Sequence, residues 1–326
     1  MKNKNLIVAL LLVVSVFISC HRRSYDWENN YSYPDYNYAT DTTSSYNDSD
    51  YSYNNNYSSP DNSTSVYNPS FTIINDIVHT KLDVKFDWNK KYLYGKAWIT
   101  LKPHFYSTDT VTLDAKGFNI NKVELVGSAS NIPLLYSYDS SLLKIWLDRV
   151  YSNNENYTLF IDYTAKPYER KTGGSSAITD QKGLYFINAD GKNPDEPRQL
   201  WTQGETEYNS AWFPTIDKPN MKHTTEISMT VDSSFVTLSN GLMTSSKNNG
   251  DGTRTDTWKM DLQYAPYLTM MAAGNWKIYH DKWRGMEVNY YMEPKYFPYA
   301  KEIFGNTPEM IEFYSKTLGV DYAWPK

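Results

Sequence analysis

Alternating apolar and polar positions begin after residue 71 and predict a β-rich region. Apolar and polar side chains alternate over residues 78–86 and again over residues 93–101. A period of two places successive side chains on opposite faces of a strand, so both segments are predicted to be half-buried strands. Asn89, Lys90 and Lys91 lie between them and predict the turn that joins the two strands.

Short segments of the same kind recur as far as residue 291. We predict further strands over residues 111–115, 122–126, 142–147, 157–163, 226–231, 235–238, 255–260, 267–272 and 287–291. The run Asn249-Gly250-Asp251-Gly252 is typical of a hairpin turn, because glycine adopts positive φ at little cost. Short strands separated by turn signals indicate an antiparallel β-sandwich or a related stack of sheets.

The pattern changes after Pro294, where helices are expected. We predict one helix around residues 299–304 and a second after Thr307, which can cap it, with Pro308 in its first turn. Gly319 is predicted to end the second helix. Its apolar face would consist of Met310, Ile311, Phe313, Tyr314 and Leu318. About 35 residues are too few to form a core of their own.

The first 20 residues predict a secretory signal. Lys2 and Lys4 precede an apolar stretch over residues 6–18, which is too short to span a bilayer. The sequence Phe17-Ile18-Ser19-Cys20 resembles the lipobox of bacterial lipoproteins, although Phe17 stands where Leu is usual. That resemblance implies a lipid on Cys20 and an exported protein anchored to a bacterial membrane, facing the periplasm. Cys20 is the chain's single cysteine; the alternative is an incidental cysteine without this role.

Residues 21–70 are rich in Tyr, Asn and Ser and contain few aliphatic side chains. Such a segment buries too little apolar surface to offset its ordering entropy, so we predict a disordered tether. An alternative is an adhesive segment that binds glycan or self-associates. The whole chain has 326 residues, 40% of them apolar, and a net charge of −5. A core is therefore possible, and nucleic acid is not an expected partner.

A block in the middle of the chain carries the most specific motif. The T-Q-x-E sequence of Thr202 to Glu205 is followed by F-P-x-x-D-x-P, which begins at Phe213. This block resembles the aminopeptidase N-like family of zinc metallopeptidases. The resemblance extends over residues 71–326 and includes Gly183-Leu184-Tyr185-Phe186 and the segment that follows Thr307.

The resemblance implies a mainly β fold with two parts. Residues 71–291 would form a saddle-like N-terminal domain of antiparallel or mixed β-sheets, and residues 292–326 the truncated start of a thermolysin-like helical domain. A complete family member binds zinc through H-E-x-x-H, but none of the five histidines here has that spacing. The run from Gly285 to Asn289 looks like the family's G-x-M-E-N but lies in a strand pattern. We therefore expect no catalytic residue and no bound metal in these 326 residues, and no activity from them alone.

Gln203 and Glu205 are the candidate substrate-binding residues. In the family, the matching acid binds the α-amino group of the peptide substrate, and the matching Gln lies beside it. An ammonium group prefers an ionised acceptor, and a glutamate with a reference pKa of about 4.3 is ionised at neutral pH. The alternative is that Glu205 is one solvated loop carboxylate among many.

The remaining motif residues predict packing. Asp217 and Pro219 are typical of a turn in which Asp accepts backbone hydrogen bonds, and Trp201, Trp212 and Phe213 are expected in the core. His223 and His280 are lone histidines with surface or satisfied roles. Two competing functions remain: a non-catalytic, lipid-anchored binding or scaffold module, and a glycan-binding surface protein.

Overall fold

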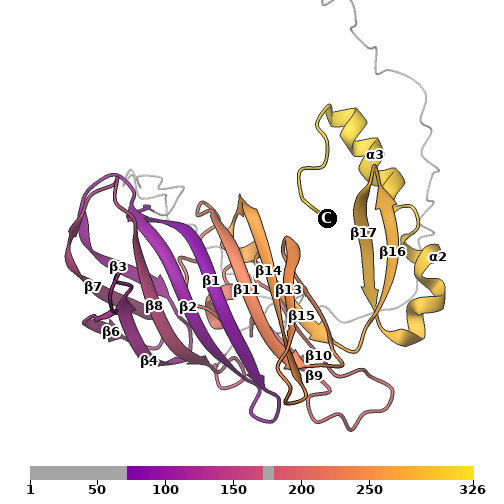
Figure 1. Ribbon diagram of the computed structural model, residues 1–326, viewed down its shortest axis with the longest axis horizontal. Helices are drawn as coiled ribbons and strands as arrows, with labels where there is room; N and C mark the ends of the chain where they lie inside the picture. The colour runs from indigo at the N-terminus through magenta and orange to yellow at the C-terminus, as the bar shows by residue number, and fades with distance from the viewer. Residues whose placement is uncertain (1–71, 172–179) are drawn as a thin grey trace, which may run out of the picture. The chain divides into compact units, whose positions relative to one another are not determined.

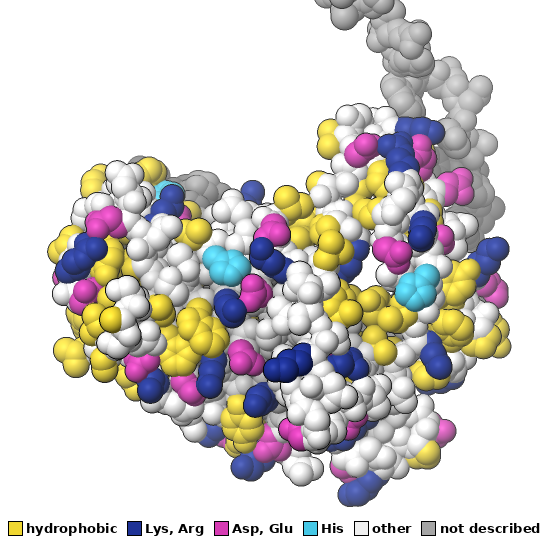
Figure 2. Space-filling view, in the orientation of Figure 1, with side chains coloured by type: hydrophobic (Ala, Val, Ile, Leu, Met, Phe, Trp, Pro, Cys, Tyr) yellow, Lys and Arg dark blue, Asp and Glu magenta, His cyan; other side chains and the backbone are white. Residues whose placement is uncertain are grey.

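A computed structural model describes residues 72–171 and 180–326 (Figure 1). The predicted signal peptide, Cys20 and the tether over residues 21–70 lie outside the described residues. Within them, no helix is long and apolar enough to cross a membrane. On the face drawn in Figure 2, basic and acidic side chains are interspersed, in keeping with totals of 32 and 37 for the chain.

An eight-stranded sheet forms the largest element of the fold. Its strand order is β13-β14-β11-β1-β2-β8-β4-β5 (Figure 1). The bounds are β1 Asn75–Asp87, β2 Tyr92–Pro103, β4 Phe118–Leu125, β5 Ile132–Pro133, β8 Tyr157–Ala165, β11 His223–Asp232, β13 Leu242–Asn248 and β14 Thr253–Tyr264. The β1–β11 pair is parallel, whereas β2 pairs antiparallel with both β1 and β8. The expected mainly β fold with mixed sheets is confirmed.

Three smaller groups of strands accompany it. A four-stranded sheet has the order β12-β15-β10-β9, a three-stranded sheet has the order β3-β7-β6, and β16 and β17 form a hairpin. The strand bounds are β3 Thr108–Asp114, β6 Tyr136–Tyr138, β7 Leu142–Tyr151, β9 Leu184–Ile187, β10 Gln199–Thr202, β12 Val236–Ser239, β15 Met271–Gly274, β16 Lys277–Trp283 and β17 Met286–Met292. The helical segments are η1 Asn209–Ala211, η2 Pro266–Leu268, η3 Pro294–Tyr299, α2 Ala300–Phe304 and α3 Thr307–Leu318.

The period of two predicted the long central strands because it reflects real burial. In β1, Leu82 and Val84 are fully buried, whereas Lys81 between Thr80 and Leu82 is exposed. The hairpin signal is also confirmed, since β13 and β14 meet at a turn in which Gly250 and Gly252 have φ of 81° and 86°. The run from Gly285 to Asn289, which looks like G-x-M-E-N, lies in a turn and in β17, as its strand pattern indicated.

The pattern missed several strands and misplaced one. All seven residues of β13 are exposed, so this edge strand shows no alternation to detect. Strands β9 and β10 have four residues each, too few for a period to be clear. The strand predicted over residues 267–272 is wrong in its first half, because Pro266 begins the 3₁₀ turn η2 and β15 starts only at Met271.

The described residues contain two hydrophobic clusters. The larger draws on strands of the eight-, four- and three-stranded sheets and on the segment after η1, including Trp212 and Phe213, both fully buried as expected. The smaller contains Trp283, Val288, Tyr290, Met292 and Ala300, with Ile311 packed against it. It unites the β16–β17 hairpin with the helical segments that follow. The boundary at residue 292 stays a prediction.

Helix α3 differs from expectation at its start and on its apolar face. Asn306 is the N-cap, while Thr307 lies inside the helix and donates its hydroxyl to the Phe304 carbonyl at 2.7 Å, so the predicted Thr307 cap is wrong. Gly319 ends the helix with φ of 69°, as predicted. Of the predicted apolar face, only Ile311 reaches the smaller cluster; the exposed members are Met310, Phe313, Tyr314 and Leu318.

Candidate functional site

Strand β10 leads into an exposed loop that carries Gln203 and Glu205. Along the chain from Leu200, side chains alternate between buried and exposed, so Trp201, Gln203 and Glu205 are exposed and the residues between them are buried. The strand is anchored on one side where the Met271 N–H donates to the Thr202 hydroxyl at 3.0 Å. On the other side, the Gln203 N–H donates to the Gly183 carbonyl at 2.9 Å.

Gly204 allows the loop to lie close to its neighbours. A Cβ at this position would lie 2.4 Å from the Asn209 amide nitrogen and 2.4 Å from the Tyr267 carbonyl oxygen, so a larger residue does not fit. The Tyr208 N–H donates back to the Gly204 carbonyl at 2.8 Å and closes the turn. The peptide bond between Glu205 and Thr206 is cis.

Asn209 joins the turn that follows the loop to the segment around η2. Its fully buried side-chain amide donates to the carbonyls of Pro266, at 2.5 Å, and Thr269, at 2.8 Å. Its carbonyl oxygen accepts the Trp212 indole N–H at 2.7 Å. Because buried polar groups cost free energy unless they are paired, this arrangement fixes the position of the turn that follows the loop.

Asp217 has the structural role that the sequence predicted. Its buried carboxylate accepts the Ser210 N–H at 2.8 Å, and its own N–H donates to the Asp114 carboxylate at 2.9 Å. Burial raises the pKa of Asp217, an effect opposed by the hydrogen bonds from Ser210. The F-P-x-x-D-x-P half of the motif therefore builds the turn.

The carboxylates of Glu205 and Glu207 have different surroundings. Glu207 pairs with the Lys218 ammonium at 2.6 Å, and its backbone carbonyl accepts from the Lys116 ammonium at 2.7 Å. The side chains of Glu205 and Gln203 are exposed and make no hydrogen bond or ion pair within the described part of the chain. The structure thus places both predicted residues on one loop, two positions apart, with exposed side chains.

Trp201 was expected in the core, and that expectation is wrong. Its side chain is 37% exposed and stacks on Tyr185 of β9, with ring centroids 4.6 Å apart and planes 23° apart. The two residues are direct cross-strand partners. The alternation with Leu200 and Thr202 was a signal for this orientation. The stacked pair shares the exposed side of the chain with Gln203, next to the candidate site.

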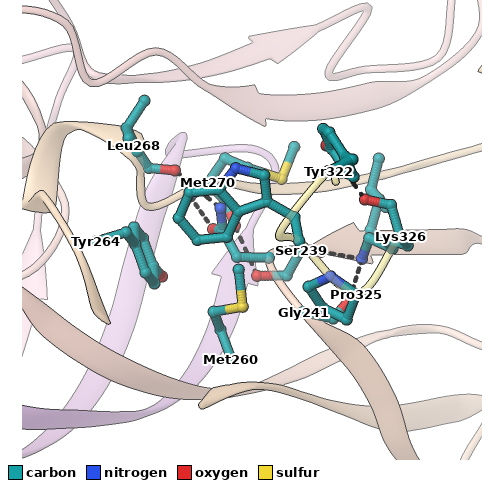
Figure 3. Close-up of a pocket in the computed structure, with 12 residues that line it drawn as sticks. Ser239, Gly241, Met260, Tyr264, Leu268, Met270, Tyr322, Pro325 and Lys326 are labelled. Atoms are coloured by element: carbon teal, nitrogen blue, oxygen red, sulfur yellow. Dashed lines mark hydrogen bonds between the residues drawn. The ribbon is translucent and has the colours of Figure 1, made fainter. Parts of the chain in front are cut away.

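A cavity of about 310 Å³ lies where the C-terminal segment meets the β-sheets (Figure 3). The Lys326 ammonium donates to the carbonyls of Ser239 and Gly241 and lies 4.0 Å from the centroid of the Trp258 ring. Burial lowers the pKa of Lys326 to about 8. Neither Gln203 nor Glu205 lines this cavity, whose contacts hold the C-terminal segment against the sheets.

His223 and His280 form hydrogen bonds with different residues and do not share a site. His223 is fully buried between the hydroxyls of Thr80 and Thr269, whereas exposed His280 bonds to Asn289. Across the described ranges, no three His, Cys, Asp or Glu side chains are grouped to hold a metal ion. These residues do not fit a zinc centre, and no catalytic step through a metal is assigned to them.

Comparison with known families shows which family the chain belongs to. The model of the "Peptidase M1 N-terminal domain" family matches residues 62–268, which include the whole T-Q-x-E and F-P-x-x-D-x-P block. The chain belongs to this family. The M1 N-terminal domain also accounts for the β fold, and the expected resemblance is confirmed.

Relatives of this M1 chain include aminopeptidases. Over 266 residues it is 23% identical to "Aminopeptidase 2, mitochondrial" of Saccharomyces cerevisiae, covering 79% of this chain and 26% of that protein. It is 25% identical over 248 residues to "Probable aminopeptidase 2" of Sulfurisphaera tokodaii, covering 76% of this chain and 28% of that protein. The chain thus spans about a quarter of the length of these relatives.

Other similar proteins extend the comparison. The chain is 25% identical over 145 residues to "Transcription initiation factor TFIID subunit 2" of Danio rerio, covering 44% of this chain and 12% of that protein. Among solved structures, the M1 zinc metallopeptidase from Deinococcus radiodurans superimposes with a TM-score of 0.62 at 16% identity, covering 78% of this chain and 56% of that one. That likeness shows the fold.

Proposed function

We propose that this chain is the substrate-side portion of a zinc-dependent aminopeptidase and that Glu205 and Gln203 bind the α-amino group of the peptide. The observation that carries the proposal is the pair of exposed polar side chains, without a partner among the described residues, on a loop whose base is fixed by buried hydrogen bonds. Aminopeptidases among the relatives and the family match supply the reaction class.

The chemistry of the loop suits an ammonium ligand. A carboxylate without an internal cation partner accepts charge-assisted hydrogen bonds, which are roughly twice as strong as neutral ones. The amide oxygen of Gln203 can accept a second hydrogen bond from the same ammonium group. Because the loop is held by Asn209 and by strand β10, little ordering entropy remains to be lost on binding.

Zinc would come from the part of a complete family member that carries H-E-x-x-H. These 326 residues contain no such motif. We therefore expect the purified chain alone to hold no stoichiometric zinc and to hydrolyse no aminoacyl substrate. Metal analysis that finds about one tightly held zinc ion for each chain would contradict this expectation.

Substrate specificity tests the assignment of Glu205. In the chain joined to a zinc-binding half from its own gene or a close relative, Glu205→Ala is expected to lower kcat/KM for peptides with an unblocked amino terminus by roughly tenfold to a thousandfold. Peptides with an acetylated amino terminus bring no ammonium and should lose far less. An equal loss for both classes of substrate would remove Glu205 from the amino-group site.

Glu207→Ala is the matched control on the same loop. Its carboxylate is bound to Lys218, so removing it should weaken local packing slightly and affect both substrate classes alike. If Glu207→Ala reduces the preference for unblocked over acetylated peptides more than Glu205→Ala does, then Glu207 and not Glu205 binds the amino group.

A non-catalytic, lipid-anchored binding or scaffold module is the second candidate. The similarity to a protein named as a transcription initiation factor subunit favours it, because this relative carries no peptidase name. The DNA that follows the codon for Lys326 separates the two. A continued reading frame that encodes G-x-M-E-N and H-E-x-x-H supports the aminopeptidase, and an immediate stop codon supports the module.

We also propose that Cys20 is lipidated and anchors an exported protein to a bacterial membrane. Support comes from the lone cysteine at the end of an apolar signal segment. Several acyl chains are needed for stable anchoring, because a single one binds only marginally. Wild-type protein should sediment with membranes, and Cys20→Ala should accumulate as unprocessed or soluble protein. Full solubility of the wild type in its native cell would refute the anchor.

A further inference from the structure

A second cavity, of about 450 Å³, is lined by neither Gln203 nor Glu205, although the Lys116 ammonium on its wall donates to the Glu207 carbonyl of the candidate loop at 2.7 Å. Three segments surround it: the turn between β3 and β4, the turn between β6 and β7, and the chain that follows β8. The lining residues are Lys116, Gly117, Phe118, Asn119, Ser140, Ser141, Lys166, Glu169, Arg170 and Lys171.

Positive charge dominates this lining. Four of its residues are Lys or Arg, and Glu169 is the single carboxylate among the residues that line it. Glu169 is already engaged, since it lies 3.6 Å from the Lys166 ammonium and accepts the Tyr92 hydroxyl. Lys116, Arg170 and Lys171 have no carboxylate within 4.0 Å in the described part of the chain.

Arg170 is the most informative member of the group. Its half-buried guanidinium donates to the Gln181 carbonyl at 3.1 Å, and burial lowers its pKa. The aliphatic part packs on Gly117, where a Cβ would lie 2.6 Å from Arg170 Cγ. The guanidinium is therefore held in position at the cavity wall, partly desolvated, and no carboxylate of the described residues forms an ion pair with it.

Four backbone donors of the cavity wall, the N–H groups of Lys116, Gly117, Phe118 and Ser141, are already used. The Gly117 N–H donates to the Ser140 carbonyl at 2.9 Å, and the Phe118 N–H donates to the Tyr138 hydroxyl at 2.7 Å. A ligand would therefore be bound by side chains, namely the cations and the hydroxyls of Ser140 and Ser141.

We propose that this cavity, lined by Lys116, Lys166, Arg170 and Lys171, binds the phosphate group of a small molecule or lipid headgroup. A phosphate carries up to two negative charges and offers several acceptor oxygens, which matches an excess of three positive charges on the wall. The planar fork of an arginine binds phosphate through two parallel hydrogen bonds, and lysines add point charges. A concave site lined by one sign of charge also concentrates ions of the opposite sign.

Calorimetric titration of the purified chain tests the site with inorganic phosphate. At low ionic strength we expect saturable binding of one phosphate per chain, weaker with added sodium chloride because the charges are partly exposed. Arg170→Gln should weaken binding about tenfold or more, because it removes a positive charge and the charge-assisted hydrogen bonds of the guanidinium. A parallel arm replaces phosphate with vesicles that contain phosphatidylglycerol.

Lys96→Gln is the matched control. It removes one positive charge from an exposed position on β2, outside the cavity, and should leave phosphate affinity unchanged. If Arg170→Gln does not fold, exposed Lys171→Gln carries the same test with a smaller expected loss.

The two arms identify the source of the phosphate. Binding of inorganic phosphate that Arg170→Gln weakens supports a soluble phosphate ligand, and binding of vesicles alone, weakened by the same change, supports a headgroup. Absence of binding in both arms overturns the proposal. An equal effect of Lys96→Gln and Arg170→Gln also overturns it, because binding would then depend on net charge and not on this cavity.

Discussion

The segment from Gln203 to Asp217 has two parts with opposite properties. From Gln203 to Glu205, polar side chains point to solvent and contact no partner within the described residues. From Asn209 to Asp217, the side chains are buried, and the hydrogen bonds of Asn209 and Asp217 reach Thr269, after η2, and Asp114 of β3. A single sequence motif thus encodes both a binding loop and the rigid base that holds it.

The difference follows from the cost of burial. A buried polar atom without a partner costs about 1–3 kcal/mol, so Asn209 must be paired where it lies. An exposed carboxylate keeps its hydration and needs no internal partner. The exposed half of the motif can therefore hold unpaired groups at little cost in stability, and variants in the two halves should differ sharply in their effect on stability.

Trp212→Ala should show the largest loss of stability. The Trp212 side chain is fully buried, donates to Asn209 and packs on Phe213 with ring centroids 4.4 Å apart. Replacing a buried Trp by Ala costs about 3–5 kcal/mol. Urea denaturation of Trp201→Ala gives the comparison, since that exposed ring should contribute much less. Equal losses for the two variants would contradict the distinction between base and loop.

Low pH should cause the second-largest loss of stability. His223 stacks beside Phe213, and burial lowers its pKa from 6.5 to about 3. The unfolded chain therefore takes up a proton before the folded chain does. Stability is fully present above pH 6.5 and is lost as the pH falls toward 3, by an amount on the order of a few kcal/mol.

The pH dependence has a direct measurement. Unfolding free energies from urea denaturation between pH 7 and pH 4 should fall steeply for the wild type and more gently for His223→Gln. Exposed His280→Gln is the control and should keep the wild-type slope. A His223→Gln slope as steep as that of the wild type would mean that other groups set the acid sensitivity.

Asn209→Ala should cost somewhat less, about 2–3 kcal/mol, because it leaves two backbone carbonyls and the Trp212 N–H without their partner. It should also loosen the loop above. Amide exchange at residues 203–208 measures that effect, and we expect faster exchange there than in the wild type. Unchanged exchange would show that the loop is held without Asn209.

The smallest effects should come from the loop carboxylates. Glu207→Ala removes a partly exposed ion pair with Lys218, which contributes about 0–1 kcal/mol. Glu205→Gln should change stability by less than about 0.5 kcal/mol, as for other surface positions without partners. Thermal unfolding of both variants tests this order. A clear loss with Glu205→Gln would reveal a structural role and weaken its assignment as a ligand.

Local pattern predicted much of this fold and part of the site. The alternation over residues 78–86 and 93–101 lies within β1 and β2, and the Gly-rich turn joins β13 and β14. The roles of Asp217, Trp212 and Phe213 in packing also followed from residue type. The Gln203–Glu205 assignment came from resemblance to a family, since one carboxylate in a loop has no distinctive local pattern.

What the sequence could not show depends on partners far along the chain. Strand β10 is defined by pairing with β9 and β15, and the network of Asn209 uses carbonyls about sixty residues away. The sequence shows which residues of α3 are apolar, but it does not show which of them are covered. Phe313, for example, is 60% exposed. The cavity lined by Lys116, Lys166, Arg170 and Lys171 likewise joins three segments that are separate in sequence.

The most direct test of the central claim is a crystal structure of the chain joined to a zinc-binding half, with a peptide analogue that has an unblocked amino terminus. We predict that the ligand's amino nitrogen lies about 2.7–2.9 Å from a carboxylate oxygen of Glu205, the usual range for a charge-assisted hydrogen bond. The side chain of Gln203 should contact the same nitrogen. A structure in which that nitrogen contacts neither residue, or pairs with Glu207, would contradict the account.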